Sequence, residues 1–325
     1  MIDKNRNIFV FPGQGAQYVG MGAKLCDEFQ VARHTFQEID DITSRHISKI
    51  CFRGPLAILN RPVNTSLGTF AHSVAIARVI ENEFGMPLYE IGDAMVGHSL
   101  GQYSALHCAG SISLHDAAKL VASRSLYMSM GRGGVGMVAI VGLNQHQVEK
   151  LLFLAVGRGF AAISNHNARD QFIISGEDDA LDAIMAGAAA QGARIARKLN
   201  IAVPAHCALM APAAMKMRNR LARVRVSAPK TDWFSNQTAD LMYAAADVKQ
   251  SLIDQMTNGV RWHEIVEKFP KYHIKHSYEL GPKGTLSRLI TRADVGVRAV
   301  HTDTGANVRE VLKLIEIDLK NRNSR

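Results

Sequence analysis

Gly97, Ser99 and Gly101 form a Gly-x-Ser-x-Gly motif, a pattern in which the serine hydroxyl can act as a nucleophile. The motif follows the short apolar run 94–96, which predicts a buried strand, and leads into 100–109, where apolar residues recur at helical spacing. Small residues allow the sharp turn of a nucleophile elbow, which places the serine beside free N–H groups at a helix N-terminus. The alternative is an ordinary glycine turn with a solvated serine, and the flanking strand and helix favour the elbow.

Such a serine needs a base near neutral pH, and histidine is the usual one. The chain has 13 histidines. His98 is adjacent to Ser99, but its side chain should point away as the backbone turns. His206 lies in the otherwise apolar segment 203–210, where a polar ring is unexpected and could serve as the base. The alternative is a core histidine held by hydrogen bonds. Because no aspartate stands out as a third member, a Ser99–His206 dyad is the simplest hypothesis.

Two further features could complete the chemistry. Arg124 lies near the apolar stripe of a helix that we expect from 114 towards 130. Its guanidinium could hold a carboxylate by two parallel hydrogen bonds, although a solvated arginine is the commoner case. Gln14 lies in the loop 12–17 after a predicted first strand at 7–11. Its two flanking glycines let the backbone turn with its N–H groups exposed, although a simple connector is the alternative.

Composition limits the classes of protein that fit. The 325 residues, 47% of them hydrophobic, suffice for one large domain carrying a smaller one, and no apolar run is long enough to span a membrane. The segment 1–7 lacks the apolar stretch of a signal peptide. The four cysteines are scattered without metal-ligand spacing, which predicts small buried side chains in a reducing compartment, and we therefore expect a cytoplasmic protein.

The formal net charge of +9 suits an anionic partner. Nucleic acid, an acidic protein and a phosphorylated cofactor are all anionic. The basic residues are dispersed, and no nucleic-acid-binding module is recognisable, so a generally basic surface is an equal alternative.

The predicted elements divide the chain into two parts. Residues 134–201 have the order β-α-β-β-α-β of a ferredoxin-like unit. Its strands are expected at 137–141, 160–164, 172–175 and 194–199, and its helices at 144–155 and 180–190. Strands alternate with helices in 1–133 and 202–325, which predicts a mostly parallel sheet covered on both faces. We therefore expect an α/β protein with a discontinuous large subdomain, an inserted small one, and a glycine-rich hinge at 131–134.

Four segments occur here in a familiar order: 11–17, 97–101, the helix around Arg124, and 203–210. In this order the chain resembles the malonyl-CoA:acyl carrier protein transacylases of bacterial type II fatty acid synthesis. The resemblance continues through Asn165-His166-Asn167 to Gln171, then through 254–262, and through Glu279-Leu280-Gly281-Pro282, so it covers nearly the whole chain.

The resemblance implies a role for each matching residue. Ser99 corresponds to the acyl-accepting nucleophile and His206 to its base. In this family a backbone carbonyl orients the histidine, and Gln255 occupies the matching position. Orientation of the histidine by a carbonyl fits the absence of an acidic third member beside Ser99 and His206.

Three more roles follow from the same resemblance. Arg124 corresponds to the arginine that binds the free carboxylate of the malonyl group. The backbone N–H groups of Gln14 and Leu100 correspond to the oxyanion hole. The family's fold, a hydrolase-like large subdomain with a ferredoxin-like small one, agrees with the element order above.

The implied activity is transfer of malonyl from malonyl-CoA to the phosphopantetheine thiol of acyl carrier protein, through a malonyl-serine and without cofactor or metal. Neither nucleic acid nor a membrane is implied as a partner. The family shares its architecture with acyltransferases that serve polyketide synthase carrier proteins, which stay an alternative. A serine hydrolase of the patatin or esterase type and a non-catalytic protein that binds the carrier are further alternatives.

Three positions depart from the family pattern. Gln102 stands where many members have Glu, Ser125 where Gly commonly follows the arginine, and Gly259 where Pro is usual. The first and third leave the dyad unaffected. Ser125 bears on how closely the Arg124 helix packs at the cleft.

Overall fold

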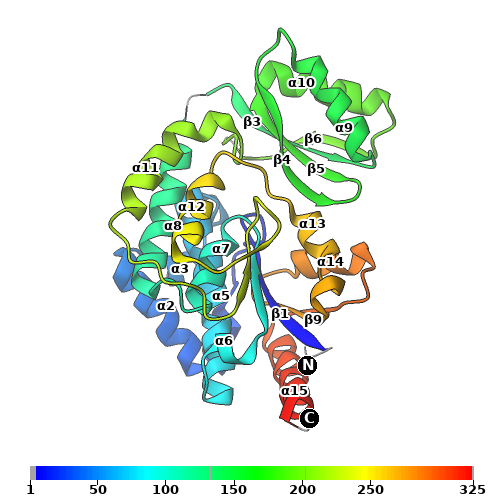
Figure 1. The fold of residues 1–325 in the computed structure, drawn as a ribbon. Coiled ribbons are helices and arrows are strands. Elements are labelled where there is room, and N and C mark those ends of the chain that lie inside the picture. Colours follow the sequence, from blue (N-terminus) through cyan, green and yellow to red (C-terminus); the bar gives the residue numbers. More distant parts are fainter. Residues whose placement is uncertain (1–4, 132, 202, 324–325) are drawn as a thin grey trace.

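The structure is a computed structural model and describes residues 5–131, 133–201 and 203–323. It has two lobes, each built on its own β-sheet, with the small lobe above the large one in the view of Figure 1. The predicted hinge at 131–134 includes Arg132, which lies outside the described residues. Met1 to Lys4, part of the segment 1–7, also lie outside them. None of the described helices is both long and apolar enough to cross a membrane.

The large lobe contains a six-stranded sheet in the order β10-β9-β1-β2-β7-β8. These strands are β1 (Arg6–Phe11), β2 (Ala94–Gly97), β7 (Asp232–Phe234), β8 (Leu241–Met242), β9 (Ile274–Glu279) and β10 (Arg298–His301). All neighbouring pairs are parallel except β7 with β8. The predicted mostly parallel sheet is confirmed.

Helices cover both faces of this sheet (Figure 1), because alternate side chains of each strand enter opposite cores. Phe9 and Phe11 of β1 belong to one core, and Ile8 and Val10 to the other. The helices before the small lobe are α1 (Ala23–Glu28), α2 (Gln30–Thr43), α3 (Ile47–Arg53), α4 (Leu56–Leu59), α5 (Pro62–Phe84), α6 (Leu88–Ile91), α7 (Gly101–Cys108) and α8 (Leu114–Ser129). Those after it are η2 (Ala208–Met210), α11 (Ala211–Leu221), α12 (Ala245–Asp254), α13 (Trp262–Glu267), η3 (Pro270–Tyr272), α14 (Thr285–Ala293) and α15 (Gly305–Asn323).

The small lobe has the predicted β-α-β-β-α-β order. Its elements are β3 (Val135–Val141), α9 (Gln145–Leu151), η1 (Leu152–Ala155), β4 (Ala161–Ala168), β5 (Gln171–Glu177), α10 (Asp178–Ala190) and β6 (Ile195–Lys198). The strand order is β4-β5-β3-β6 and every neighbouring pair is antiparallel, which is the ferredoxin-like arrangement. This lobe has its own apolar core, which includes Val138, Phe172 and Leu181.

The parallel register of β1 and β2 determines where the functional segments emerge. Phe11 pairs with Gly97, so the loop after β1 and the elbow after β2 leave the sheet at one edge. The lobes also meet near this edge: the N–H of Val260 donates to the carbonyl of Ser164 (2.9 Å), and the N–H of His166 donates to that of Val260 (2.9 Å). Carboxyl ends of parallel strands are where open α/β sheets place their ligands.

Candidate active site

The Gly-x-Ser-x-Gly segment forms a nucleophile elbow between β2 and α7. Ser99 has φ +53°, a left-handed conformation that is strained for a serine and fits a sharp strand-to-helix turn. A Cβ on Gly97 would lie 1.9 Å from the carbonyl carbon of Gly101, and one on Gly101 would lie 2.0 Å from the carbonyl oxygen of Phe11. Only glycine fits at either position, because backbone occupies the space of the missing side chains.

Asn236, just beyond β7, braces the elbow. Its Oδ1 accepts a hydrogen bond from the N–H of Ser99 (2.7 Å), and its Nδ2 donates to the carbonyl of Gly97 (2.8 Å). The sequence reasoning missed this buried residue. The available signal was its position, since it follows a strand that ends at the same sheet edge as the elbow.

The structure brings Ser99 and His206 together across 107 positions of sequence. Ser99 Oγ lies 2.7 Å from His206 Nε2, and His206 Nδ1 lies 2.5 Å from the carbonyl oxygen of Gln255. Because a carbonyl can only accept, Nδ1 carries the ring proton and Nε2 is free to accept the serine proton. The arrangement is that of a serine with a general base oriented by backbone.

His206 is buried, and burial lowers the pKa of its imidazole to about 3, with the charge of Arg124 as the second cause. The resting ring is therefore neutral and able to take a proton. His98 turns away from the serine, as expected from the turn. Its Nε2 lies 2.9 Å from Oδ1 of Asn167, and its ring meets Trp262 edge-on.

Arg124 reaches Ser99 from α8. Its Nη2 donates to Ser99 Oγ (3.0 Å), its side chain is 1% exposed, and its Nε has no partner among the described residues. No carboxylate in the described part of the chain forms an ion pair with it. Burial lowers the pKa of this guanidinium. A buried cation without a counter-ion is costly, so this arrangement favours an anionic ligand next to the serine.

Leu100 belongs to the elbow, and the loop of Gln14 lies beside it. The loop of Gln14 rests on it, since a Cβ on Gly13 would lie 2.8 Å from the carbonyl oxygen of His98. Leu100 immediately precedes α7. Within the described residues neither backbone N–H donates a hydrogen bond, which leaves both available to an oxyanion.

The three unusual positions leave this geometry intact. Gln102 is buried in α7, and Gly259 faces β4, where a Cβ would lie 3.1 Å from the carbonyl oxygen of Ile163. Ser125 is accommodated by a hydrogen bond, because its hydroxyl donates to Ser66 Oγ (2.6 Å). Among the described residues no three His, Cys, Asp or Glu side chains converge on a possible metal site.

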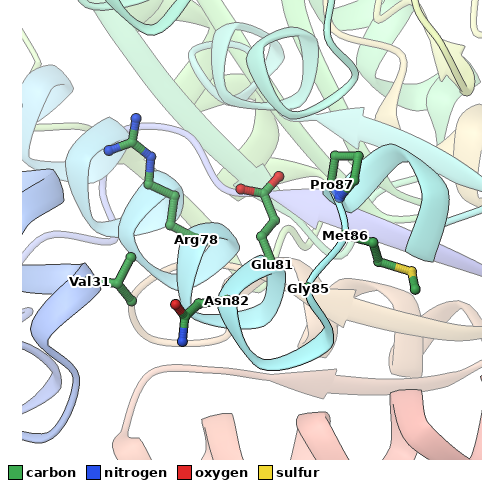
Figure 2. Close-up of a pocket in the computed structure, with 7 residues that line it drawn as sticks. All are labelled: Val31, Arg78, Glu81, Asn82, Gly85, Met86 and Pro87. Carbon is green, nitrogen blue, oxygen red and sulfur yellow. The ribbon is translucent and has the colours of Figure 1, made fainter.

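A surface pocket of about 420 Å³ lies elsewhere, at the C-terminal end of α5. Figure 2 shows its lining from α5 and the following turn, with Val31 from α2. Its charged groups are already partnered: Arg78 Nη1 contacts Glu38 (2.5 Å), and Glu81 accepts the N–H of Leu88 (2.9 Å). It lies roughly 22 Å along the helix from Ser66, so it takes no part in this site.

Comparison with known proteins gives a consistent answer. Residues 8–293 match the family model described as "Acyl transferase domain". A malonyl CoA-acyl carrier protein transacylase of Salmonella typhimurium is 36% identical over 287 residues, 87% of this chain and 91% of that protein. This chain belongs to the malonyl-CoA:acyl carrier protein transacylase family. The family's two-lobed α/β architecture is the one described above.

Solved structures of transacylases agree. An acyl-carrier-protein S-malonyltransferase from Bartonella henselae superposes with a TM-score of 0.92 at 33% identity, covering 96% of this chain and 99% of that one. A malonyl-transacylase solved in complex with a type II PKS acyl-carrier protein gives a TM-score of 0.90 at 33% identity, covering 95% and 99%. The roles of individual residues in this chain stay predictions, which the geometry above makes testable.

The depressed pKa of His206 predicts an unusual pH profile. An imidazole with a pKa of about 3 stays unprotonated from pH 8 down to pH 5, whereas an ordinary one, near about 6.5, loses its basicity in that range. Labelling of Ser99 by an uncharged fluorophosphonate should therefore show no acid limb between pH 8 and 5. The rate is measured by intact mass, with Ser99→Ala as the unlabelled control. A fall centred near pH 6.5 would contradict the assignment.

Packing at the elbow predicts a stability effect. Gly101→Ala places a methyl group against the carbonyl of Phe11 and should destabilise the fold by about 3 kcal/mol, the upper end of typical overpacking costs. Gly131→Ala is the control, because its new Cβ would lie 3.9 Å from the carbonyl oxygen of Met128, an ordinary contact distance. Urea unfolding of both variants compares them. Equal stability of the two would refute the close approach.

Proposed function

We propose that this chain transfers the malonyl group from malonyl-CoA to the phosphopantetheine thiol of acyl carrier protein through a malonyl ester on Ser99. The observation that carries the proposal is the meeting of three groups: Ser99 Oγ contacts both His206 Nε2 (2.7 Å) and the buried guanidinium of Arg124 (3.0 Å). A nucleophile, its base and a carboxylate-binding cation are thus in direct contact. Membership of the transacylase family supports the same conclusion.

The first half-reaction acylates Ser99. His206 Nε2 takes the hydroxyl proton as Oγ attacks the thioester carbonyl carbon, and the N–H groups of Gln14 and Leu100 hold the resulting oxyanion. The tetrahedral intermediate collapses with cleavage of the carbon–sulfur bond. Coenzyme A leaves with the proton from His206 as a thiol, and Ser99 keeps the malonyl group.

The second half-reaction reverses the roles. The pantetheine thiol gives its proton to His206 and attacks the ester carbonyl, and the same oxyanion hole serves again. Cleavage of the carbon–oxygen bond returns the proton to Ser99 Oγ. The cycle yields malonyl-carrier protein and the free serine, and this chemistry requires no metal or cofactor.

Arg124 explains the preference for malonyl. The Nε group of its guanidinium is free to meet the distal carboxylate while Nη2 lies at the serine. An acetyl group would leave this buried cation unpaired, which costs about 1–3 kcal/mol or more, enough for at least tenfold discrimination. This feature also argues against a patatin- or esterase-type hydrolase, which has no use for a carboxylate-binding arginine beside its nucleophile.

The two partners proposed for this chain are both anionic. Coenzyme A carries phosphates and acyl carrier proteins are acidic, so the net charge of +9 favours both encounters. The family points to a carrier of fatty acid synthesis. The similarity to a transacylase bound to a type II PKS carrier keeps a polyketide carrier as the second candidate.

The cysteines support a cytoplasmic location in this proposal. Cys26, Cys51, Cys108 and Cys207 are buried and unpaired in the structure. Burial raises the pKa of each thiol, which disfavours the reactive thiolate. Free buried thiols are typical of proteins of a reducing compartment.

Covalent labelling tests the nucleophile. Incubation with malonyl-CoA should leave one malonyl adduct, mapped by peptide mass spectrometry to Ser99. Ser99→Ala should take no label, whereas Ser104→Ala, which removes a buried hydroxyl on α7, should still be labelled. Release of free malonate without any carrier protein would indicate a hydrolase instead.

Replacement of Arg124 tests the acyl preference. Arg124→Ala should lower transfer from malonyl-CoA at least tenfold and raise the relative use of acetyl-CoA, because the cation that pairs with the carboxylate is gone. The measurement is transfer to holo-carrier protein from a panel of acyl-CoAs, with thermal unfolding as the check on folding. An unchanged malonyl preference would remove Arg124 from this role.

A further inference from the structure

Two buried hydroxyl groups lie beneath the loop that carries Gln14. Ser66 in α5 is 0% exposed and Ser125 in α8 is 2% exposed. Ser125 Oγ donates to Ser66 Oγ (2.6 Å), and the side-chain Nε2 of Gln14 donates to the same Ser66 oxygen (2.5 Å). Ser66 Oγ therefore accepts two hydrogen bonds, one from the helix of Arg124 and one from the loop after β1.

The loop needs such an anchor. Gly13, on one side of Gln14, packs against the carbonyl oxygen of His98. Gly15, on the other side, has φ +102° and no heavy atom within 4 Å of a Cβ position, so the backbone lacks packing there. Gln14 itself is exposed, yet its amide reaches inward to the buried Ser66. The same amide nitrogen also lies 3.4 Å from the carbonyl oxygen of Pro62, a longer contact.

The anchor acts on catalytic geometry, because the backbone N–H of the anchored residue is one of the two proposed oxyanion donors. An oxyanion donor works only within a few tenths of an ångström of its position, and a displacement of about 1 Å can cost a hundredfold in rate. A side chain held at Ser66 restricts this displacement. Ser125, which follows Arg124 directly, ties the same oxygen to the turn of α8 that bears the carboxylate-binding cation.

We propose that Ser66 and Ser125 are positioning residues that fix the backbone N–H of Gln14 over Ser99 during acyl transfer. The inference rests on the proposed function, since it concerns the same oxyanion. Neither serine touches the substrate; both act through the Gln14 side chain. Serine at position 125, where the family commonly has glycine, thereby has a physical role in this chain.

The test uses the full-length protein and single-turnover acylation by malonyl-CoA, followed by rapid quench and intact mass. Ser66→Ala and Gln14→Ala should each lower the maximal acylation rate roughly tenfold or more, because the oxyanion donor is no longer held. The malonyl-CoA concentration at half-maximal rate should stay within about twofold, since the cation at Arg124 is unchanged. The double variant should be no slower than either single variant, because both remove one anchor.

Ser73→Ala is the matched control. Ser73 lies on the same helix, is 0% exposed, and its hydroxyl has no partner among the described residues. This variant should acylate at the wild-type rate. Gln14→Ala changes an exposed side chain, so it tests the anchor even where a buried replacement perturbs folding.

Two outcomes would overturn the inference. One is a wild-type acylation rate in a folded Gln14→Ala or Ser66→Ala variant. The other is a double variant whose loss is the product of the single losses, which means that the two side chains act independently. Absence of any Ser99 adduct in the wild-type chain would instead refute the proposed function, so the two failures are distinguishable.

Discussion

The site depends on the approach of α7 to the end of β1. The N–H of His98 donates to the carbonyl of Phe11 (2.9 Å), and Gly101 lies directly against that carbonyl. Because no side chain intervenes, the elbow and the loop of Gln14 lie side by side at the sheet edge. This approach brings the loop of Gln14 against the elbow that contains Ser99 and Leu100. Under the proposed function, a helix only slightly farther from the sheet would separate Ser99 from one of the two oxyanion donors.

A second feature of the site is a charge kept without a counter-ion. The guanidinium of Arg124 is buried, and it donates a hydrogen bond to the neutral hydroxyl of Ser99 rather than forming an ion pair. Burial of this uncompensated charge lowers the stability of the fold. The proposed acyl donor, malonyl-CoA, supplies the missing anion when it binds. The same feature gives selectivity, because a ligand without a carboxylate leaves that cost uncompensated. Stability and specificity thus oppose each other at one side chain.

The spacing of apolar residues predicted the helices and strands. The features that it did not predict depend on contacts between residues far apart in the sequence. Apolar periodicity predicted a helix from 114 towards 130, and α8 covers Leu114–Ser129. β4 runs to Ala168, beyond the predicted 164, because its polar end pairs with Val260 of the other lobe. Motif and resemblance located the dyad. The roles of Asn236 and Ser66 were not predicted. Their hydrogen-bond partners lie 137 and 59 positions away, and no periodicity in the sequence indicates such polar pairs.

The base and the cation are electrostatically coupled. Burial and then the charge of Arg124 hold the pKa of His206 at about 3, which keeps the resting ring neutral but makes it a weak base. Under the proposed function, the malonyl carboxylate pairs with Arg124 and offsets that charge. Pairing of Arg124 then raises the pKa of His206, while burial, the larger cause, still lowers it. A donor that carries the carboxylate therefore both satisfies the buried cation and strengthens the base, whereas an acetyl donor does neither. Substrate choice and activation of Ser99 then follow from one ion pair.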